Sequence, residues 1–192
     1  MRPKIEPVGG ETMLFRRLWP REQDAILAHL LRLDPDDRQL RFGGVMRDGD
    51  IAAYVGRMNW SRSLIVGCEI GGVLRAIGEL KAIRRDWRPT AEVAVTVERP
   101  FQDRGIGGRL FRRLMTLAAN RGFRRLYVLC VAQNRRMRNI VLHHGASLTH
   151  YESEVEGEVD LPWPSHLTLA QEMIDAYVAT VQSALAPALP GS

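Results

Sequence analysis

Directly after the apolar segment 91–97, the sequence carries the residues with the clearest chemical potential, the glycine-rich turn Gln102, Asp103, Arg104, Gly105, Ile106, Gly107, Gly108 and Arg109. Glycines have no side chain, so the backbone N–H groups of this turn can approach an anion closely. Apolar residues at helical spacing predict a helix over 105–121, whose positive N-terminal end points at the same spot. The side chains of Arg104 and Arg109 would add charge-assisted contacts. The segment therefore predicts a phosphate-binding site at a strand-to-helix turn.

Two other phosphate-binding patterns do not fit this turn. The dinucleotide fingerprint needs G-x-G-x-x-G and an acidic residue about 20 residues further on. Here the third glycine is misplaced, and the next apolar segment ends in Gln133-Asn134. The G-x-x-x-x-G-K-[ST] phosphate loop does not occur in the chain. A glycine-rich turn can also be a plain connection between a strand and a helix, and the turn alone leaves that alternative open.

The bulk composition limits the class of protein. A chain of 192 residues with 45% hydrophobic residues can bury one sizeable core, which predicts a single domain over 1–192. Its apolar runs fall short of the roughly 20 residues of a membrane-spanning helix, and residues 1–20 lack a secretory-signal pattern. Cys68 and Cys130 predict buried free thiols, and the five histidines lack metal-ligand spacing, so no metal site is predicted. We expect a cytoplasmic protein without a membrane partner.

Positive charge is concentrated in one part of the chain. Residues 99–142 contain eleven arginines and one acid, Asp103, whereas residues 151–192 contain seven acids and no Lys or Arg. The net charge of +5 is therefore a local basic excess around the glycine-rich turn rather than a general basic surface. The preference for arginine over lysine can also result from the base composition of the genome, so it is not evidence for a nucleic-acid partner. Nucleic acid is not predicted as a partner.

The hydrophobic periodicity predicts the elements that position the turn. Helices are expected after Pro20 as far as Leu31, over 51–58 with Asp50 as the N-cap, over 105–121, over 135–144 and, with an amphipathic pattern, over 166–185. A short helical turn is expected over 36–42. Strands are expected over 64–70 and 73–83, joined by Gly71-Gly72, and over 91–97, 126–131, 147–152 and 154–161. This order predicts an α/β (α+β) fold with a mixed sheet.

Carboxylates alternate strictly near the end of the predicted sheet, at Glu152, Glu154, Glu156, Glu158 and Asp160. Alternation of this kind puts all five on one strand face. A solvated or charge-protected edge is the ordinary interpretation. Recruitment of a cationic partner is the functional one, and both stay open at this point.

The turn resembles a known family signature. Gln102-Asp103-Arg104-Gly105-Ile106-Gly107 is similar to the Q/R-x-x-G-x-G/A motif of the GCN5-related N-acetyltransferase (GNAT) superfamily. It lies in the expected order of strand, turn, helix, strand, asparagine and helix. The resemblance covers about 79–146, the expected cofactor core, and leaves the predicted strands and helix of 147–186 as a C-terminal part.

This resemblance implies a splayed mixed sheet flanked by helices, with acetyl-CoA entering between the strands 91–97 and 126–131. Pantetheine would follow the first of these strands, bonded to the main chain near Val95 and Val97. The pyrophosphate would lie on the amides of residues 104–109, and Asn134 matches the family's side-chain contact to the cofactor.

A narrower resemblance links the chain to bacterial protein-lysine acetyltransferases of the same superfamily. It is carried by Asp34-Pro35 with Arg41-Phe42, by Ala91-Glu92-Val93-Ala94 and by Asn134-Arg135-Arg136-Met137. Glu92 matches the general base of that subgroup, and Glu79 on the neighbouring strand is the second candidate. Many members of the superfamily have a tyrosine seven residues after the asparagine, which protonates the leaving thiolate. This chain has Val141 at that position.

The resemblance therefore implies an acyl-CoA-dependent N-acetyltransferase, which moves an acetyl group from acetyl-CoA to a primary amine by direct attack, without a metal. The acceptor would be a protein lysine or a small cationic amine. Because Val141 replaces the tyrosine, a non-catalytic acyl-CoA sensor or interaction module is the alternative. A homodimer is left open.

Overall fold

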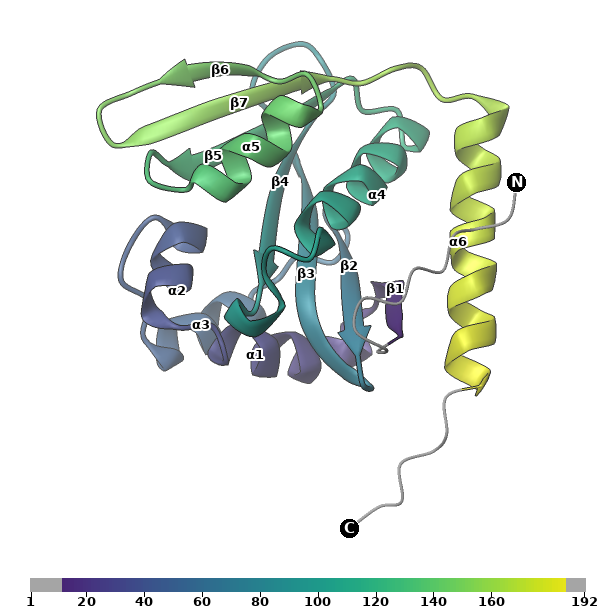
Figure 1. Cartoon of the computed structure of the whole chain (residues 1–192). Helices are drawn as coiled ribbons and strands as arrows, with labels where there is room; N and C mark the ends of the chain where they lie inside the picture. The colour runs from purple at the N-terminus through teal and green to yellow at the C-terminus, as the bar shows by residue number, and fades with distance from the viewer. Residues whose placement is uncertain (1–11, 186–192) are drawn as a thin grey trace.

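The computed structural model describes residues 12–185, which form one seven-stranded sheet with six α-helices around it (Figure 1). The strands are β1 (Met13–Leu18), β2 (Ser63–Ile70), β3 (Val73–Ile83), β4 (Thr90–Val97), β5 (Arg125–Val131), β6 (Ser147–His150) and β7 (Glu154–Asp160). The helices are α1 (Gln23–Leu31), α2 (Pro35–Phe42), α3 (Asp48–Gly56), α4 (Ile106–Asn120), α5 (Arg135–His143) and α6 (His166–Leu185). The predicted mixed sheet flanked by helices is confirmed.

The sheet has the order β1-β2-β3-β4-β5-β7-β6, and its central pair diverges. β4 and β5 are parallel, whereas every other neighbouring pair is antiparallel. Their pairing covers only three positions and ends at Glu92 opposite Tyr127. Residues 93–97 of β4 therefore have an edge that faces away from β3 without a partner strand. Figure 1 shows β4 and β5 separating at this point.

Helices cover the two faces of the sheet. α4 packs on β2, β3 and β4 through its buried apolar stripe, while α1 contacts β3 from the other face and α2 reaches β4 and β5. The approach of α4 needs a glycine in β3, because a Cβ at Gly78 would lie 2.7 Å from Leu114 Cδ1. α6 stands beside β1 and α4 at the side of the molecule (Figure 1).

The packing produces two apolar cores, one on each face of the sheet. The larger lies under α4 and α5 and includes Phe111 and Leu126, both fully buried. The smaller lies under α1 and α3 and includes Ile26 and Ile51. Together the two cores cover β2 on both faces, which explains its nearly continuous apolar pattern, whereas β5 contributes only to the larger core and exposes Leu129 on its other face.

The fold corrects three sequence predictions. β1 was not predicted; its arginines hide the alternation, and it exists because β2 pairs with all six of its residues. Asp50 is not the N-cap of α3. The helix begins two residues earlier, and the Asp50 carboxylate accepts a hydrogen bond from the N–H of Arg47, the N-cap residue (3.0 Å). Glu152 precedes β7 and so does not share its face.

Several predicted features lie where expected. Both cysteines are buried free thiols, on β2 and β5. Across residues 12–185 no helix combines the length and the apolar character needed to cross a bilayer. The single domain over 1–192 stays a prediction, since residues 1–11 and 186–192 lie outside the described part of the chain.

Candidate functional site

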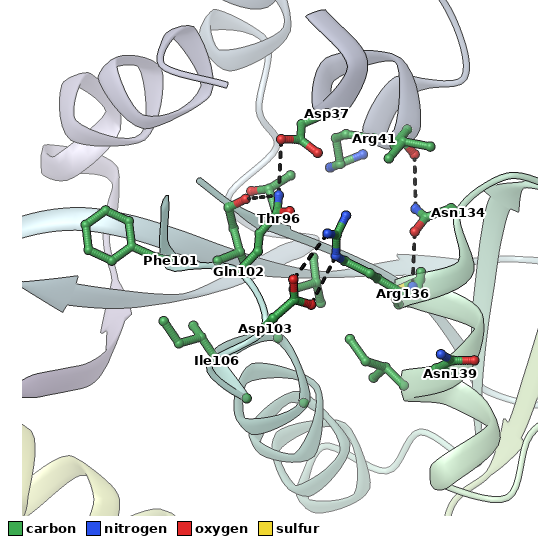
Figure 2. A pocket seen from close by; sticks show the side chains of 18 of the residues that line it. Asp37, Arg41, Thr96, Phe101, Gln102, Asp103, Ile106, Asn134, Arg136 and Asn139 are labelled. Atoms are coloured by element: carbon green, nitrogen blue, oxygen red, sulfur yellow. Dashed lines mark hydrogen bonds and ion pairs between the residues drawn. The ribbon is translucent and has the colours of Figure 1, made fainter. Parts of the chain in front are cut away.

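A cavity of about 480 Å³ opens where β4 and β5 diverge (Figure 2). Its walls come from four places: the free half of β4, the glycine-rich turn with the start of α4, the first two turns of α5, and α2. Nine of the eleven predicted cofactor residues line it: Val95, Val97, Gln102, Asp103, Gly105, Ile106, Gly107, Gly108 and Asn134. The sequence-predicted residues are thus brought together around one space of ligand size.

Backbone amides at the start of α4 supply anion-binding donors. Gly105 takes a left-handed conformation (φ 74°) as the N-cap, which glycine adopts without steric cost. The first intrahelical bond of α4 runs from Arg109 N–H to Gly105 O (3.1 Å). The N–H groups of residues 106–108 therefore have no partner within the helix. Together with the helix dipole they form a site for a phosphate group.

Gly107 is the glycine in closest contact with the opposite wall. A Cβ at this position would lie 3.0 Å from Ile140 Cδ1 and 3.9 Å from side-chain atoms of Val95 and Val97. A side chain at 107 would consequently project into the cavity between β4 and α5. Glycine at position 107 therefore keeps the space between β4 and α5 open.

The free edge of β4 points its backbone polar groups into the opening. Glu98 N–H donates to Arg75 O (3.0 Å) near the start of β3, so alternate residues turn their N–H and C=O groups to the other side. In agreement, the Gln102 side chain reaches Val97 O from the cavity side (2.9 Å). The main-chain groups of Val95 and the N–H of Val97 accordingly face the opening, as the sequence prediction required.

α2 closes the cavity with polar contacts. Gln102 Nε2 also donates to Asp37 Oδ2 (3.1 Å), and burial raises the pKa of the Asp37 carboxyl, helped by a hydrogen bond that its protonated form donates to Asp34. Asn134 uses its side chain twice: Oδ1 caps α5 by accepting from Met137 N–H (3.0 Å), and Nδ2 reaches Leu40 O (3.5 Å). The Gln102–Asp37 and Asn134–Leu40 contacts join the mouth of the cavity to α2 (Figure 2).

Arginine side chains behave differently from their sequence prediction. Arg136 forms an ion pair with Asp103 across the mouth of the cavity (3.2 Å), and this pairing lowers the pKa of Asp103 (Figure 2). The Arg104 guanidinium lies over the Phe101 ring (5.3 Å). The Arg109 guanidinium lies over the ring of Phe15, on β1 (4.7 Å). Neither Arg104 nor Arg109 lines the cavity, because their side chains are engaged with these aromatic rings.

Glu79 sits in a buried polar cluster outside the cavity. Its carboxylate accepts hydrogen bonds from Arg41 (2.9 Å), from Ser63 Oγ (3.2 Å) and from the Tyr54 hydroxyl. Burial raises the pKa of Tyr54 to about 12, so the phenol stays protonated and donates. Arg41 also lines the cavity, which makes it the link between the two. Three donors occupy the two oxygens of Glu79, and this arrangement favours a structural carboxylate.

Glu92 lies at the vertex of the opening. It stands opposite Tyr127 in the last β4–β5 pair, and its neighbours Ala91 and Val93 are buried on the α4 side. Its side chain is therefore directed to the other face of the sheet. It is half-buried, and within residues 12–185 it makes no hydrogen bond or ion pair. Glu92 does not line the cavity, yet it is a carboxylate free to accept a proton beside it.

The acidic strand β7 is neutralised by arginines. Arg85 contacts Glu156 and Glu158, and Arg125 contacts Glu158 and Asp160. The Tyr127 hydroxyl donates to Glu156 Oε1 (2.8 Å), while the Arg85 guanidinium lies 4.1 Å from the centre of the Tyr127 ring. The strand is thus neither a purely solvated face nor a set of free carboxylates. The alternating pattern in the sequence identified the carboxylates, but it did not indicate the arginines that pair with them.

Other residues of the site had no sequence signal. Thr96 lines the cavity and bonds to the buried His29 (Oγ1 to Nε2, 2.8 Å), whose other ring nitrogen lies 3.1 Å from Glu98; burial lowers the pKa of His29. His143 and His144 also line the cavity.

Val141 lies in the larger core with 1% of its surface exposed. That face of α5 therefore offers no proton donor. Among residues 12–185, no three His, Cys, Asp or Glu side chains are grouped as metal ligands would be.

Comparison with known proteins gives consistent matches. The model of the acetyltransferase (GNAT) family matches residues 11–145. Acetyltransferase PA5475 of Pseudomonas aeruginosa is 27% identical over 135 residues, which cover 68% of this chain and 73% of that protein. The GNAT domain of S. lividans PAT has a TM-score of 0.66 at 19% identity, over 81% of this chain and 99% of that one. The structure of yncA from Salmonella typhimurium with its cofactor acetyl-CoA has a TM-score of 0.62 at 16% identity, over 80% and 96%.

Proposed function

The chain belongs to the acetyltransferase (GNAT) family, and from that premise we propose that it transfers the acetyl group of acetyl-CoA to a primary amine, carried by a protein lysine or a small cationic molecule. Family membership makes it an N-acetyltransferase with acetyl-CoA as its co-substrate. One observation carries the finer proposal. β4 and β5 stop pairing at Glu92, which leaves a free strand edge and three free amides around one opening, with the unpaired Glu92 carboxylate at the position where the pairing ends.

The cavity residues suit the parts of acetyl-CoA. The pyrophosphate would lie on the N–H groups of residues 106–108, where backbone donors and the helix dipole act together. The pantetheine amides would pair with the free edge of β4 at Val95 and Val97, in the manner of an added strand. This places the thioester towards the vertex of the opening, and so towards Glu92.

Direct transfer needs one proton acceptor. The amine nitrogen attacks the thioester carbonyl, the carbon–sulfur bond breaks, and the proton lost as the amide forms goes to the CoA thiolate; before the attack, a cationic acceptor must give up its ammonium proton. We assign that proton to Glu92, because its carboxylate is half-buried and has no other partner among residues 12–185. Glu79 remains the second candidate, ranked lower because Arg41, Tyr54 and Ser63 occupy its oxygens.

The same face of the sheet supports a cationic acceptor. Tyr127, opposite Glu92 on β5, bonds through its hydroxyl to Glu156 on β7, and these two residues already hold one guanidinium, that of Arg85. A ring face combined with a carboxylate binds cations in general. An ammonium that replaced Arg85 would meet the same two partners and come close to the proposed base.

The test is a panel of amines under saturating acetyl-CoA, with thiol release as the signal. Lysine peptides and polyamines form the cationic group, and glycine and an acetylated lysine peptide form the neutral controls. We expect turnover with cationic primary amines and none with the blocked peptide. Equal turnover with neutral and cationic amines would contradict the cationic acceptor, and acetyl-CoA binding without turnover of any amine would contradict the proposed reaction.

A further inference from the structure

A second cavity, of about 500 Å³, lies between β1, α4 and α6. No residue of its lining is shared with the β4–β5 cavity. Figure 1 shows α6 standing upright beside β1 and α4. Its volume falls within the usual range for small-molecule sites. The acetyl transfer described above uses none of its residues.

Two aromatic rings in this second cavity each carry a guanidinium. Arg17 lies 4.1 Å from the centre of the Trp19 ring, and Arg113 lies 4.5 Å from the centre of the Phe15 ring. The aliphatic wall includes Leu117. Rings stacked with guanidinium groups form flat surfaces that carry positive charge. The shape and chemistry of the lining therefore suit a flat ligand.

Positive charge in the second cavity exceeds the negative charge available to it. Four arginines line it, namely Arg16, Arg17, Arg21 and Arg113, against two acids, Glu172 and Asp175. Glu172 is engaged by Asn120 (2.8 Å) and Arg121 (3.0 Å) and also lies near Arg17, while Asp175 lies beside Arg113.

Three of those arginines lack a strong partner. Arg113 Nε lies 3.4 Å from Asp175 Oδ2 but makes no hydrogen bond within the described residues. Arg17 and Arg21 form no ion pair with any carboxylate in residues 12–185. Only Arg16 is fully engaged, by Glu22 and Glu69.

The pKa shifts of these arginines agree with their lack of strong carboxylate partners. Burial lowers the pKa of both Arg17 and Arg113, and the neighbouring charge of Arg121 adds to the effect at Arg17. By contrast, hydrogen bonds or charges from carboxylates raise the pKa of Arg85, Arg99 and Arg136. The Arg113 guanidinium is thus partly buried with one weak carboxylate partner, whereas the Arg17 guanidinium lies at the surface beside Arg121 without an ion pair. An anion placed between them would pair with both.

We propose that the second cavity binds a small planar aromatic anion, with its ring against Phe15 and Trp19 and its acidic group between Arg17 and Arg113. A carboxylate or sulfonate fits the fork of a guanidinium through two parallel hydrogen bonds. An uncharged ring would gain only the apolar contacts. An aliphatic polyanion would miss the aromatic surfaces.

Two fluorescent probes test the charge and the ring separately. 1-Anilinonaphthalene-8-sulfonate carries a planar ring system and a sulfonate, and N-phenyl-1-naphthylamine has the same rings without the charge. We expect the sulfonate to bind about tenfold more tightly than the neutral probe, the scale of one charge-assisted contact. Acetyl-CoA should not displace it, because the two cavities share no residue.

Variants locate the probe. Arg17→Gln and Arg113→Gln should each weaken the sulfonate about tenfold and leave the neutral probe unchanged. The matched control is Arg124→Gln, since Arg124 stacks on Trp163 (3.6 Å) outside both cavities. Retained thermal stabilisation by acetyl-CoA shows that each variant is folded. Arg17 lies on the surface, so its variant decides the outcome if Arg113→Gln does not fold.

Three results would overturn the proposal. Equal affinity for the two probes would make the second cavity a purely apolar surface. Displacement by acetyl-CoA would place the probe in the β4–β5 cavity. Probe binding that increases when a dimer is diluted would show that a second copy of the chain covers the second cavity.

Discussion

The two cavities are nearly equal in volume, about 480 and 500 Å³, but the groups proposed to bind anions in them differ in origin. The β4–β5 cavity presents backbone amides at the start of α4, and the arginine at its mouth is paired with Asp103. The second cavity presents arginine side chains from β1 and α4 that lie on aromatic rings. A site made of backbone donors requires glycines at fixed spacing. A site made of side chains from distant elements requires no motif.

The two cavities therefore predict different responses to mutation. A substitution that fills the glycine turn should remove one site and spare the other. Loss of a single guanidinium should weaken anion binding in the second cavity without abolishing it. The predictions below separate the two cavities, beginning with the largest effect.

Gly107→Glu should leave no measurable acetyl-CoA binding at concentrations that saturate the wild type. The new side chain would project towards Ile140 and place a negative charge beside the free amides of α4. Isothermal titration measures the loss, and an unchanged circular dichroism spectrum with normal binding of the naphthalene sulfonate is the control. Retained acetyl-CoA affinity would mean that the pyrophosphate binds elsewhere.

Glu92→Gln should lower turnover by roughly 10²-fold near neutral pH, the usual scale for a lost general base, with little change in acetyl-CoA affinity. The amide keeps the shape but cannot take a proton. Because the amine acceptor loses its own proton at high pH, the rate of the variant should recover as the pH rises towards the pKa of the amine. Glu79→Gln is the comparison. If Glu79→Gln shows this pH-dependent defect and Glu92→Gln does not, the base is on β3.

Acetyl-CoA at about 100 times its Kd should raise the free energy of unfolding by about 2.7 kcal/mol, since it binds only the folded protein. The measurement is urea unfolding with and without the ligand. The naphthalene sulfonate at saturation should add to this stabilisation, because the two cavities are separate. A failure of acetyl-CoA to stabilise the fold would contradict its assigned site.

Replacing Glu154, Glu156 and Glu158 by Gln should raise the KM of cationic acceptors by about tenfold, the lower end of electrostatic steering effects. The Kd of acetyl-CoA should not change, since none of the three lines its cavity. Steady-state kinetics with a polyamine and with a neutral amine distinguish charge recruitment from general damage. Equal losses for both amines would restore the interpretation of β7 as a structural strand.

Asp37→Asn should give the smallest effect, a roughly twofold to threefold lower Kd for acetyl-CoA, because it removes a negative charge from an anion site. It should also change stability with pH. The folded-state pKa of Asp37 is raised, so its favourable contribution is complete below the unfolded pKa of about 3.9 and is lost as the pH rises through the folded pKa.

The Asn variant should therefore gain stability relative to the wild type between pH 4 and pH 7. Urea unfolding at both pH values measures this difference. A constant difference would mean that Asp37 keeps its ordinary pKa in the folded protein.

Much of the fold was readable because local patterns were strong. The Gly71-Gly72 hairpin, the amphipathic α4 and the apolar β5 each follow from residues close together in the sequence. β1 was missed because its strand character comes from pairing with β2, about fifty residues later. A single strand with two adjacent arginines does not reveal that partner.

In the candidate site, too, residues predicted from local spacing differ from side chains whose positions depend on distant partners. Gln102, Gly105 and Gly107 were found from spacing, and they line the cavity as expected. The side chains of Arg104 and Arg109 were assigned to phosphate, but aromatic rings hold them elsewhere. Phe15, the partner of Arg109, belongs to the strand that the pattern did not reveal.

By itself, the sequence predicted the backbone of a candidate anion site, because glycine freedom and the helix dipole are local properties that depend on neighbours along the chain. Only the tertiary structure decided which charges remain free. Glu92 and Glu79 lie in equally strand-like segments, yet distant donors occupy Glu79 and leave Glu92 without a partner in the described chain. Likewise, the cavity beside α6 exists because helix packing brings Arg17 and Arg113 to one space across nearly a hundred residues. Long-range electrostatics depend on distance in space, and spacing along the chain does not record that distance.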